Sequence, residues 1–479
     1  MLACTQMQYI LVPTSDDYDL SNKLSSQTAK KTSDSFGLKP IIIFILFGIL
    51  FLGYLGIAYN IKPTKFGSSA IDSLASSLNL HKPFYAVIID AGSTGSRVLA
   101  FTFHTSIVSG DLVLDDEFFA EVKPGLSNFA DNPKEGVKTL ASLVDKAKNV
   151  IPKSAWAHTP IDMKATAGLR LLPKDKADML LEECKKYLKE SGFMVKKNFV
   201  SIMDGVNEGI YAWFTVNFLV GRFSSSYFDN TAAVLDLGGG STQITYVPNE
   251  QERHQLQKHV HEINVFNQNM SLYTYSHLGM GLMAARKAIL TSDIDLEQLD
   301  TTSTVEIRSE CINPIVTSAW SYGGIDYLVK GPVNGSHIIV KASNYGGTDE
   351  NRPIVKFSDC MKIVKKYTDT IKEKPVGLNK HDIYTVSYYF DRAAETGLID
   401  PKDGGVITLQ SFHKTALDTC NYPNVDQPFM CLDLTYIYVL LRDCFELEPS
   451  TKLNLYKKYN GHELSWSLGS AFSLFQNDI

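Results

Sequence analysis

The chain has 479 residues, of which 44% are hydrophobic, with 46 Lys and Arg against 52 Asp and Glu for a formal net charge of −6. This is the composition of a globular protein, and it excludes a disordered tail protein and a disulfide miniprotein. Because nucleic-acid binding needs clustered Lys and Arg, the mildly acidic balance leads us to expect no nucleic-acid partner. The length predicts two or three packed units.

One segment near the N-terminus is long and apolar enough to span a membrane. Residues 40–61 contain no charged side chain, and a bilayer core needs about 20 apolar residues in a helix. We therefore expect a cytosolic tail at residues 1–39, a single transmembrane anchor at 40–61 and a small, polar stem at 62–80. The alternative is a helix buried in a soluble domain.

Cysteines and glycosylation sequons indicate the side of the membrane on which the rest of the chain lies. Six of the seven cysteines and both sequons follow the predicted anchor, as is typical of the secretory lumen or cell exterior. We expect a type II membrane protein with a luminal C-terminal part. Spacing alone cannot resolve the cysteine pairing. The residues concerned are Cys184, Cys311, Cys360, Cys420, Cys431 and Cys444, with sequons at Asn269 and Asn334.

From Phe84 onward, apolar runs alternate with helical stretches at residues 136–150, 174–191 and 205–220. This alternation predicts an α/β fold.

Two strand–loop–strand segments in this region resemble each other. Each ends an apolar strand at an aspartate, Asp90 or Asp236, then turns through a glycine loop with hydroxyls and continues as an alternating strand. Glycine loops between strands point several backbone N–H groups into one concavity that binds phosphate oxygens. We expect both loops to bind phosphate, with a divalent cation held through water by the two aspartates. The alternative is two ordinary glycine turns.

Two further segments place polar residues at predicted helix starts. Thr166 lies in a small-residue turn, which could also be a plain strand-to-helix connection. Glu208 lies in the first turn of a predicted amphipathic helix that carries Trp213 and Phe214 on its apolar face. The helix dipole stabilises an anion there, which suits a group that accepts a proton from water. A glutamate that only stabilises the helix is the alternative.

Taken in order, five motifs resemble the apyrase conserved regions of the nucleoside triphosphate diphosphohydrolase family, most closely its Golgi or secreted nucleoside diphosphatase branch. The resemblance covers residues 84–475. It implies an α/β fold of two ribonuclease-H-like, actin-type lobes around an interlobe active-site cleft, with lobe I at 81–203 and 457–479 and lobe II at 204–456. The motifs are Asp-Ala-Gly-Ser-Thr-Gly-Ser-Arg at 90–97, Lys-Ala-Thr-Ala-Gly-Leu-Arg at 164–170, Gly-Val-Asn-Glu-Gly at 205–209 with Ala212 and Trp213, Asp-Leu-Gly-Gly-Gly-Ser-Thr-Gln at 236–243 and Ser-Trp-Ser-Leu-Gly at 465–469.

The resemblance implies hydrolysis of the terminal phosphate of nucleoside diphosphates, with triphosphates as further candidates, by in-line attack of water. Ca²⁺ or Mg²⁺ is the implied cofactor. Asp90 and Asp236 would hold the cation through water, Glu208 would be the general base, and Ser241 and Gln243 would orient the water. Phosphate contacts would come from Ser93, Thr94, Gly95, Thr166, Gly239 and Gly240.

The same resemblance implies three further features. The nucleotide base would stack near Tyr389 and Phe390, two disulfides would join Cys311 to Cys360 and Cys420 to Cys431, and the protein would reside in the Golgi or another secretory membrane or be secreted after cleavage in the stem. Two other functions stay open: an exopolyphosphatase-like phosphatase of the same fold, and an actin- or chaperone-like nucleotide switch. The preferred base, the cation and the oligomeric state are not predicted.

Overall fold

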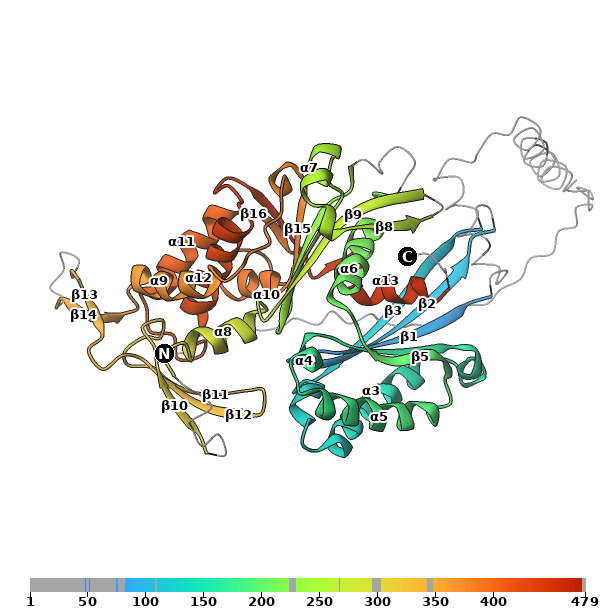
Figure 1. Ribbon diagram of the computed structural model, residues 1–479, viewed down its shortest axis with the longest axis horizontal. Helices are drawn as coiled ribbons and strands as arrows, with labels where there is room; N and C mark the ends of the chain where they lie inside the picture. The colour runs from blue at the N-terminus through green and yellow to red at the C-terminus, as the bar shows by residue number, and fades with distance from the viewer. Residues whose placement is uncertain are drawn as a thin grey trace, which may run out of the picture. The chain divides into compact units, whose positions relative to one another are not determined.

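The computed structural model of the chain is shown in Figure 1. The chain divides into two units, Met1–Ile71 and Asp72–Ile479, and the fold described below is that of the second. The predicted tail, anchor and stem lie outside the described residues, apart from three positions. Within the described residues, no helix combines the length and the apolar character that crossing a bilayer requires. The structure describes residues 48, 51, 75, 82–107, 110–223, 230–266, 268–294, 303–342 and 348–475.

The first β-sheet has five strands. In order across the sheet they are β3 (Leu112–Val122), β2 (Ser96–Thr105), β1 (Phe84–Ala91), β4 (Pro160–Ala165) and β5 (Met194–Ile202). The central strand β1 pairs antiparallel with β2, its hairpin partner, and parallel with β4. The last six residues of β1 are buried, because both faces of this strand contact apolar clusters.

Two helices of the first sheet's half, α3 (Pro133–Val150) and α5 (Lys174–Lys189), confirm helices predicted from the sequence. Proline at the first position of α3 leaves no amide hydrogen without a partner, which favours a helix start there. Leu143, Val144 and Leu180 of these helices are fully buried in one cluster with Val87 of β1 and its neighbours. Shorter helical segments in this half are η1 (Leu126–Phe129), η2 (Lys153–His158) and α4 (Ala167–Arg170).

The second β-sheet has seven strands. In order they are β16 (Gly405–Thr408), β17 (Lys452–Leu455), β15 (Ile383–Ser387), β6 (Ala233–Leu237), β7 (Ser241–Tyr246), β9 (Gln268–Leu278) and β8 (Val260–Val265). Strand β6 pairs antiparallel with β7 and parallel with β15, as β1 pairs with β2 and β4 in the first sheet. The sequence repeat is therefore also a repeat of topology. The predicted alternation along β7 is wrong, because all six of its residues are buried.

Helices α6 (Gly205–Leu219) and α13 (Trp466–Ser473) pack against each other (Figure 1). The ring centroids of Phe214 on α6 and Phe472 on α13 are 5.1 Å apart. Both residues share one apolar cluster with Phe101 of β2. Helix α6 is present as predicted, but it is not amphipathic: the second sheet and α13 cover it, so residues on nearly all of its sides are buried.

The remaining helices form the largest apolar cluster, together with the second sheet. Five of them pack as a layer, the π-helical turn after α12 continues it, and three shorter segments accompany them. The layer consists of α8 (Leu282–Leu290), α9 (Phe357–Thr368), α10 (Tyr388–Glu395), α11 (Leu409–Cys420) and α12 (Met430–Val439); the others are α7 (Glu250–Gln255), η4 (Gln257–His259), η6 (Leu378–Lys380) and a π-helical turn at Leu440–Cys444.

Three small sheets complete the described elements. A three-stranded sheet has the order β10 (Val305–Arg308), β12 (Ile325–Lys330) and β11 (Thr317–Tyr322). Two antiparallel hairpins are β13 (Ser336–Val340) with β14 (Glu350–Ile354), and β18 (Lys458–Tyr459) with β19 (His462–Glu463).

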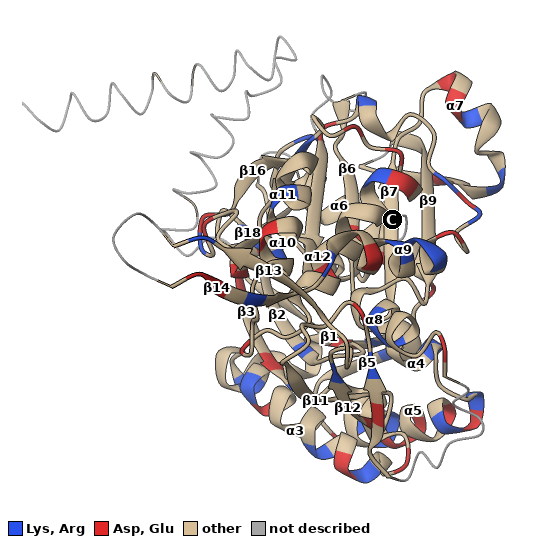
Figure 2. Cartoon of the chain, turned by 90° about the vertical axis from the view of Figure 1, so that its left-hand side faces the viewer, with Lys and Arg blue, Asp and Glu red and all other residues tan. Residues whose placement is uncertain are grey.

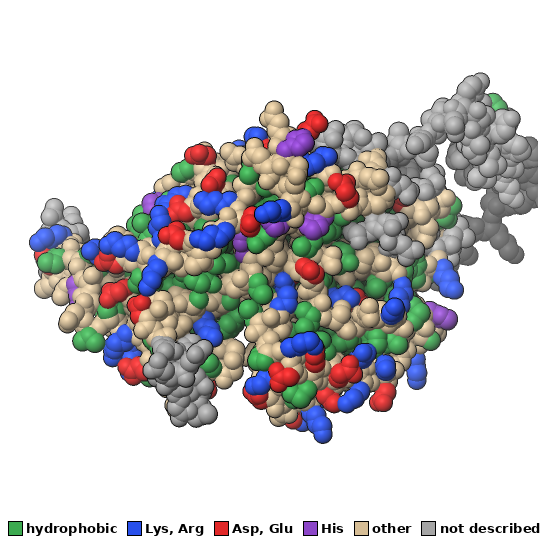
Figure 3. Space-filling model, in the orientation of Figure 1, with side chains coloured by type: hydrophobic (Ala, Val, Ile, Leu, Met, Phe, Trp, Pro, Cys, Tyr) green, Lys and Arg blue, Asp and Glu red, His purple; other side chains and the backbone are tan. Residues whose placement is uncertain are grey.

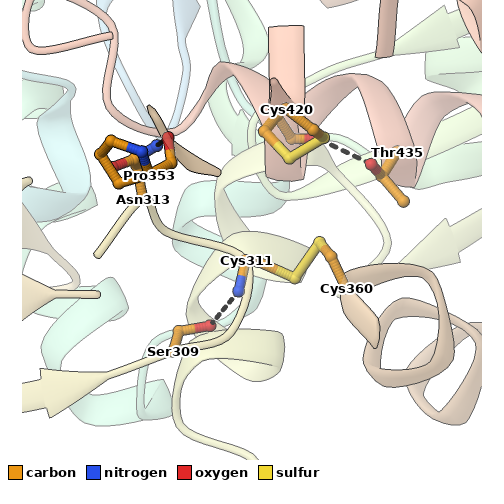
Figure 4. Close-up of a disulfide and its surroundings, with 8 residues drawn as sticks. Ser309, Cys311, Asn313, Pro353, Cys360, Cys420 and Thr435 are labelled. Atoms are coloured by element: carbon orange, nitrogen blue, oxygen red, sulfur yellow. Dashed lines mark hydrogen bonds between the residues drawn. A yellow bond between two sulfur atoms is a disulfide. The ribbon is translucent and has the colours of Figure 1, made fainter. Parts of the chain in front are cut away.

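Both predicted disulfides are confirmed (Figure 4). Cys311–Cys360 joins the loop after β10 to α9, and Cys420–Cys431 joins α11 to α12. The Cys311 amide donates to Ser309 Oγ at 3.2 Å, as Figure 4 shows. The remaining described cysteines, Cys184 and Cys444, are free and buried.

The surface mixes charges of both signs. Lysines alternate with aspartates and glutamates along α3 and α5 (Figure 2), where pairs such as Lys186–Glu183 lie within ion-pair distance. Basic, acidic and hydrophobic side chains are likewise interspersed on the face seen in Figure 3. Both sequon asparagines, Asn269 and Asn334, are exposed.

Candidate active site

A cavity of about 410 Å³ lies between the β1–β2 loop and the β6–β7 loop, so both sheets contribute to its wall. Most of the residues predicted to act on phosphate line this cavity. They are Asp90, Ser93, Thr94, Thr166, Glu208, Asp236, Gly239, Gly240 and Ser241.

The two loops have the same backbone turn. Gly92 N–H donates to the Gly95 carbonyl at 3.0 Å, and Gly238 N–H donates to the Ser241 carbonyl at 3.0 Å. The loops also approach each other closely, because a Cβ atom at Gly239 would lie 2.3 Å from Ser93 Oγ. Any larger residue at this position would push the Ser93 and Thr94 side chains away, so glycine suits the close approach of the loops.

The carbonyl groups of the second loop are turned away from the cavity. Those of Gly238, Gly239 and Gly240 accept backbone N–H groups of residues 279–284, at the start of α8, at 2.8 to 3.0 Å. Among the described residues, no backbone carbonyl accepts the N–H of Gly239 or Gly240. Successive N–H groups in such a loop form an anion-binding concavity. The loop can therefore donate to phosphate oxygens.

Asp90 and Asp236 occupy equivalent positions in the two hairpins. Each is the penultimate residue of its strand, and each pairs across the hairpin with the residue seven positions later, Arg97 or Gln243. Burial raises the pKa of Asp90, although the neighbouring Arg97 guanidinium opposes the shift. Burial also raises the pKa of Asp236 to about 6. The repeat thus places two buried carboxyl groups at one cavity.

These two carboxyl groups fit a hard divalent cation only as a partial ligand set. Asp90 Oδ1 and Asp236 Oδ1 are both buried without a hydrogen-bond partner, and carboxylate oxygens are the ligands that Ca²⁺ and Mg²⁺ prefer. Within the described part of the chain, no group of three or more His, Cys, Asp or Glu side chains could hold a metal ion. Water and substrate oxygens would have to supply the other ligands.

Glu208 lies in the first turn of α6 and is 7% exposed. Gln243 Nε2 lies 3.1 Å from Glu208 Oε2 and 2.8 Å from Ser241 Oγ, so the three predicted catalytic residues form one network. Burial raises the pKa of Glu208 to about 8; Arg170 opposes this rise, while Asp236 and Asp90 add to it. A carboxyl group with a pKa near the working pH is suited to proton transfer.

Two arginines of the site were not predicted. Arg170 Nη2 donates to Glu208 Oε2 and lies 3.4 Å from Ser241 Oγ. Arg97 Nη1 donates to Asp90 Oδ2 at 3.0 Å and lines the cavity. Both arginines belong to motifs that the sequence analysis quotes. An arginine that ends a motif of small residues is the signal that could have identified them, because a guanidinium removed from water needs a carboxylate partner.

Three of the predicted residues do not line the cavity: Gln243, Gly95 and, as described below, Tyr389. Gln243 lies behind Ser241 and reaches the site only through the contacts described above. Gly95 closes the turn of the first loop with its carbonyl group and is covered by Glu121. A phosphate contact from Gly95 therefore has no support here.

The predicted stacking site for the nucleotide base, Tyr389 and Phe390, needs a similar correction. Phe390 lines the cavity, but Tyr389 is fully buried in the second sheet's core. Tyr388 lines the cavity instead. The Tyr389 side chain packs in that core and does not reach the cavity.

Paired glycine loops on repeated hairpins, two buried aspartates and a buried glutamate beside them define a phosphohydrolase of the actin-like α/β class. The chain belongs to the GDA1/CD39 (nucleoside phosphatase) family, whose model matches residues 78–479. The resemblance predicted from the five motifs is thereby confirmed.

Relatives of known name and structure agree with this assignment. The human protein named nucleoside diphosphate phosphatase ENTPD5 is 40% identical over 398 residues, which cover 82% of this chain and 88% of that protein. Human ectonucleoside triphosphate diphosphohydrolase 6 is 36% identical over 413 residues, which cover 85% of this chain and 80% of that protein. The solved structure of a nucleoside triphosphate hydrolase from Neospora caninum has a similar fold, with a TM-score of 0.50 at 13% identity, and covers 85% of this chain and 96% of that one.

Proposed function

We propose that this chain hydrolyses the terminal phosphate of nucleoside diphosphates, releasing the shorter nucleotide and orthophosphate. The observation that carries the proposal is the network of Glu208, Ser241 and Gln243 at the wall of a cavity formed by two phosphate-type loops. The name of the 40% identical human relative, a nucleoside diphosphate phosphatase, supports the choice of substrate.

In this reaction Glu208 accepts the proton of the attacking water, and Ser241 with Gln243 orients that water. Arg170 stabilises the ionised form of Glu208, which burial disfavours. The free N–H groups of the glycine loops take up charge on the phosphate oxygens as it develops in the transition state. No step requires a covalent bond between enzyme and phosphate.

Asp90 and Asp236 would hold Ca²⁺ or Mg²⁺ through water, and their unpartnered Oδ1 atoms support this role. A bound cation would supply positive charge that neutralises the phosphate oxygens. Thr166, Ser93 and Thr94 line the same cavity and would donate hydroxyl hydrogens to phosphate.

The fold would act as two lobes around the cavity, lobe I at 81–203 with the returning 457–479 and lobe II at 204–456. The arrangement of one glycine loop in each sheet supports this division.

The chain would be a single-pass type II membrane protein of the Golgi or another secretory membrane, anchored by residues 40–61. Two disulfides and two exposed sequon asparagines in the region after the anchor support a luminal catalytic part. Digestion with an N-glycosidase tests the topology: a shift in gel mobility is expected, and an unglycosylated protein from secretory cells contradicts it.

The activity is tested with the purified full chain and a panel of UDP, GDP, IDP, ADP and the matching triphosphates. Orthophosphate release at about 1 to 1,000 per second per enzyme is expected for a dedicated hydrolase, whereas a nucleotide switch turns over more slowly. Release should stop in excess chelator and return when Ca²⁺ or Mg²⁺ is added. Inorganic polyphosphate is the substrate that would favour the exopolyphosphatase alternative. Undiminished hydrolysis in chelator contradicts the role given to the two aspartates.

A further inference from the structure

Ser276 of β9 contacts the catalytic network from outside, and the proposed reaction does not yet use it. Strand β9 pairs antiparallel with β7, and Ser276 lies directly opposite Gln243. Side chains of directly opposed residues lie on the same face of a sheet. Gln243 Nε2 lies 3.0 Å from Ser276 Oγ, within hydrogen-bond distance. The Ser276 hydroxyl therefore contacts the amide that is proposed to orient the attacking water.

The orientation of the Gln243 amide depends on its nitrogen. Nε2 also lies 2.8 Å from Ser241 Oγ and 3.1 Å from Glu208 Oε2, but an amide nitrogen carries only two hydrogens for these three oxygens. The amide oxygen, Oε1, is buried and has no hydrogen-bond partner among the described residues. Of the three oxygens around Nε2, that of Ser276 is the one to which the proposed reaction gives no role.

Ser276 lies on the far side of Gln243 from the substrate. It does not line the active-site cavity, which Ser241 and Glu208 do line. It is half-buried and lines a second cavity, also of about 410 Å³, together with Arg170. When one hydrogen of Nε2 is bonded to Ser276, the other is left for Ser241 and Glu208. Without the Ser276 hydroxyl, the amide can rotate and no longer holds these two groups in one arrangement.

The repeat of the two hairpins extends to a third strand and supports this reading. In the first sheet, Arg97 lies opposite Asp90 on one side and opposite Glu121 of β3 on the other. Arg97 Nη2 lies 3.1 Å from Glu121 Oε1. In the second sheet, Gln243 lies between the other aspartate and Ser276 in the same way. In each sheet, the residue that faces the aspartate is thus contacted by a side chain of the next strand.

We propose that Ser276 is a positioning residue for the hydrolytic reaction. Its hydroxyl accepts one hydrogen of the Gln243 amide and thereby directs the other hydrogen to the groups that act on water. Ser276 touches neither substrate nor water and acts only through Gln243. This inference rests on the proposed nucleoside diphosphatase function.

The first measurement is kcat and KM of Ser276→Ala in the full chain, with the best nucleoside diphosphate of the substrate panel. The variant should lose about three- to tenfold in kcat, the range that corresponds to one lost neutral hydrogen bond. KM should stay near the parent value, because Ser276 does not line the active-site cavity.

A double-mutant cycle with Gln243→Met shows whether the loss passes through Gln243. Two residues that act through one contact have non-additive effects. Methionine has no amide for Ser276 to hold, so adding Ser276→Ala to Gln243→Met should lower kcat no further.

Thr274→Val is the matched control. Thr274 is two residues before Ser276 on β9 and lies opposite Thr245 of β7, as Ser276 lies opposite Gln243. Its hydroxyl forms a buried hydrogen bond of 2.8 Å with that of Thr245, and neither threonine lines the active-site cavity. Thr274→Val should lower the melting temperature and leave kcat at the parent value.

Three results overturn the positioning role. They are a kcat in Ser276→Ala equal to that of the parent, an equal fall in Thr274→Val, and a fall in Ser276→Ala that is the same in the parent and in the Gln243→Met background. Each of these leaves the proposed function standing, because the parent is still active. A parent chain that hydrolyses no nucleoside diphosphate overturns the proposed function and this inference with it.

Discussion

Arg170 and Glu208 form a buried ion pair in which Nη2 of the guanidinium donates to Oε2 of the carboxylate. The arginine ends α4 beside the first sheet, and the glutamate opens α6 against the second. The two side chains are 14% and 9% exposed, so solvent screens the pair weakly. The arginine thereby makes ionisation of the proposed general base possible in a site that otherwise disfavours it.

Replacing Arg170 by Met should move the pH dependence of the reaction. Arg170 opposes the rise in the pKa of Glu208, so its loss should raise that pKa above about 8 and shift the acidic limb of the kcat profile to higher pH. At pH 7 kcat should fall, by about a factor of ten for each pH unit by which the pKa rises. Profiles of kcat from pH 5 to 10 measure the shift.

Lys174→Met is the control for this prediction. Lys174 pairs with Asp178 on the exposed side of α5 and does not line the cavity. Its removal should leave the acidic limb in place. An acidic limb that does not move in Arg170→Met contradicts the link between this arginine and the ionisation of Glu208.

Much of the fold could be predicted because local signals agree with the final structure. The repeat of an apolar strand, an aspartate and a glycine loop predicts the two hairpins, and both occur with the same turn. Helices α3 and α5 follow from their apolar spacing. The prediction of which residues are exposed fails where packing between distant elements buries a second face. Helix α6 and strand β7 are covered on both sides, and no local pattern reveals a second covering layer.

The site was predictable as a set of motifs but not as a set of contacts. Residues of both loops and Glu208 line one cavity, as the motifs imply. The sequence could not show that Arg170 pairs with Glu208, because the two residues come from different elements that meet only in the fold. The prediction that the base stacks near Tyr389 fails for a similar reason: that ring packs in the core of the second sheet, and only the fold shows which rings are left at the cavity.

Glu117→Gln should make stability less dependent on pH. Burial raises the pKa of Glu117 to about 7 from its ordinary value of 4.5, so its stabilising contribution is fully present below pH 4.5 and is lost as the pH rises through 7. Glutamine cannot ionise and still accepts the Glu463 N–H, which lies 3.1 Å from Glu117 Oε1. At pH 8 the variant should be more stable than the parent by up to about 3 kcal/mol, and at pH 4.5 the two should be nearly equal.

Urea unfolding at the two pH values measures this difference. Glu135→Gln on α3, whose side chain is 46% exposed, is the control and should change stability little at either pH. A Glu117→Gln variant that is less stable than the parent by the same amount at both pH values contradicts the prediction.

The two disulfides should stabilise the folded chain unequally. Cys311 and Cys360 are 49 residues apart, and Cys420 and Cys431 are 11 apart. In the chain-entropy model, opening the first should cost about 4 kcal/mol and opening the second about 3 kcal/mol. The free energies of unfolding of the Cys311→Ser/Cys360→Ser and Cys420→Ser/Cys431→Ser variants measure the two costs. A larger loss from the second pair would show that native-state packing, and not loop length, sets the order.

The turnover number of Glu208→Gln tests the account most directly. Glutamine keeps the size of the side chain but cannot accept the proton of water, so kcat for the best nucleoside diphosphate should fall about 10²- to 10⁴-fold. Nucleotide affinity should stay near the parent value, because the phosphate contacts come from the glycine loops. Glu252→Gln is the control and should keep the parent kcat, because Glu252 pairs with Lys380 and does not line the cavity. A kcat in Glu208→Gln equal to that of the parent, with affinity and melting temperature also unchanged, would contradict the assignment of Glu208 as the general base.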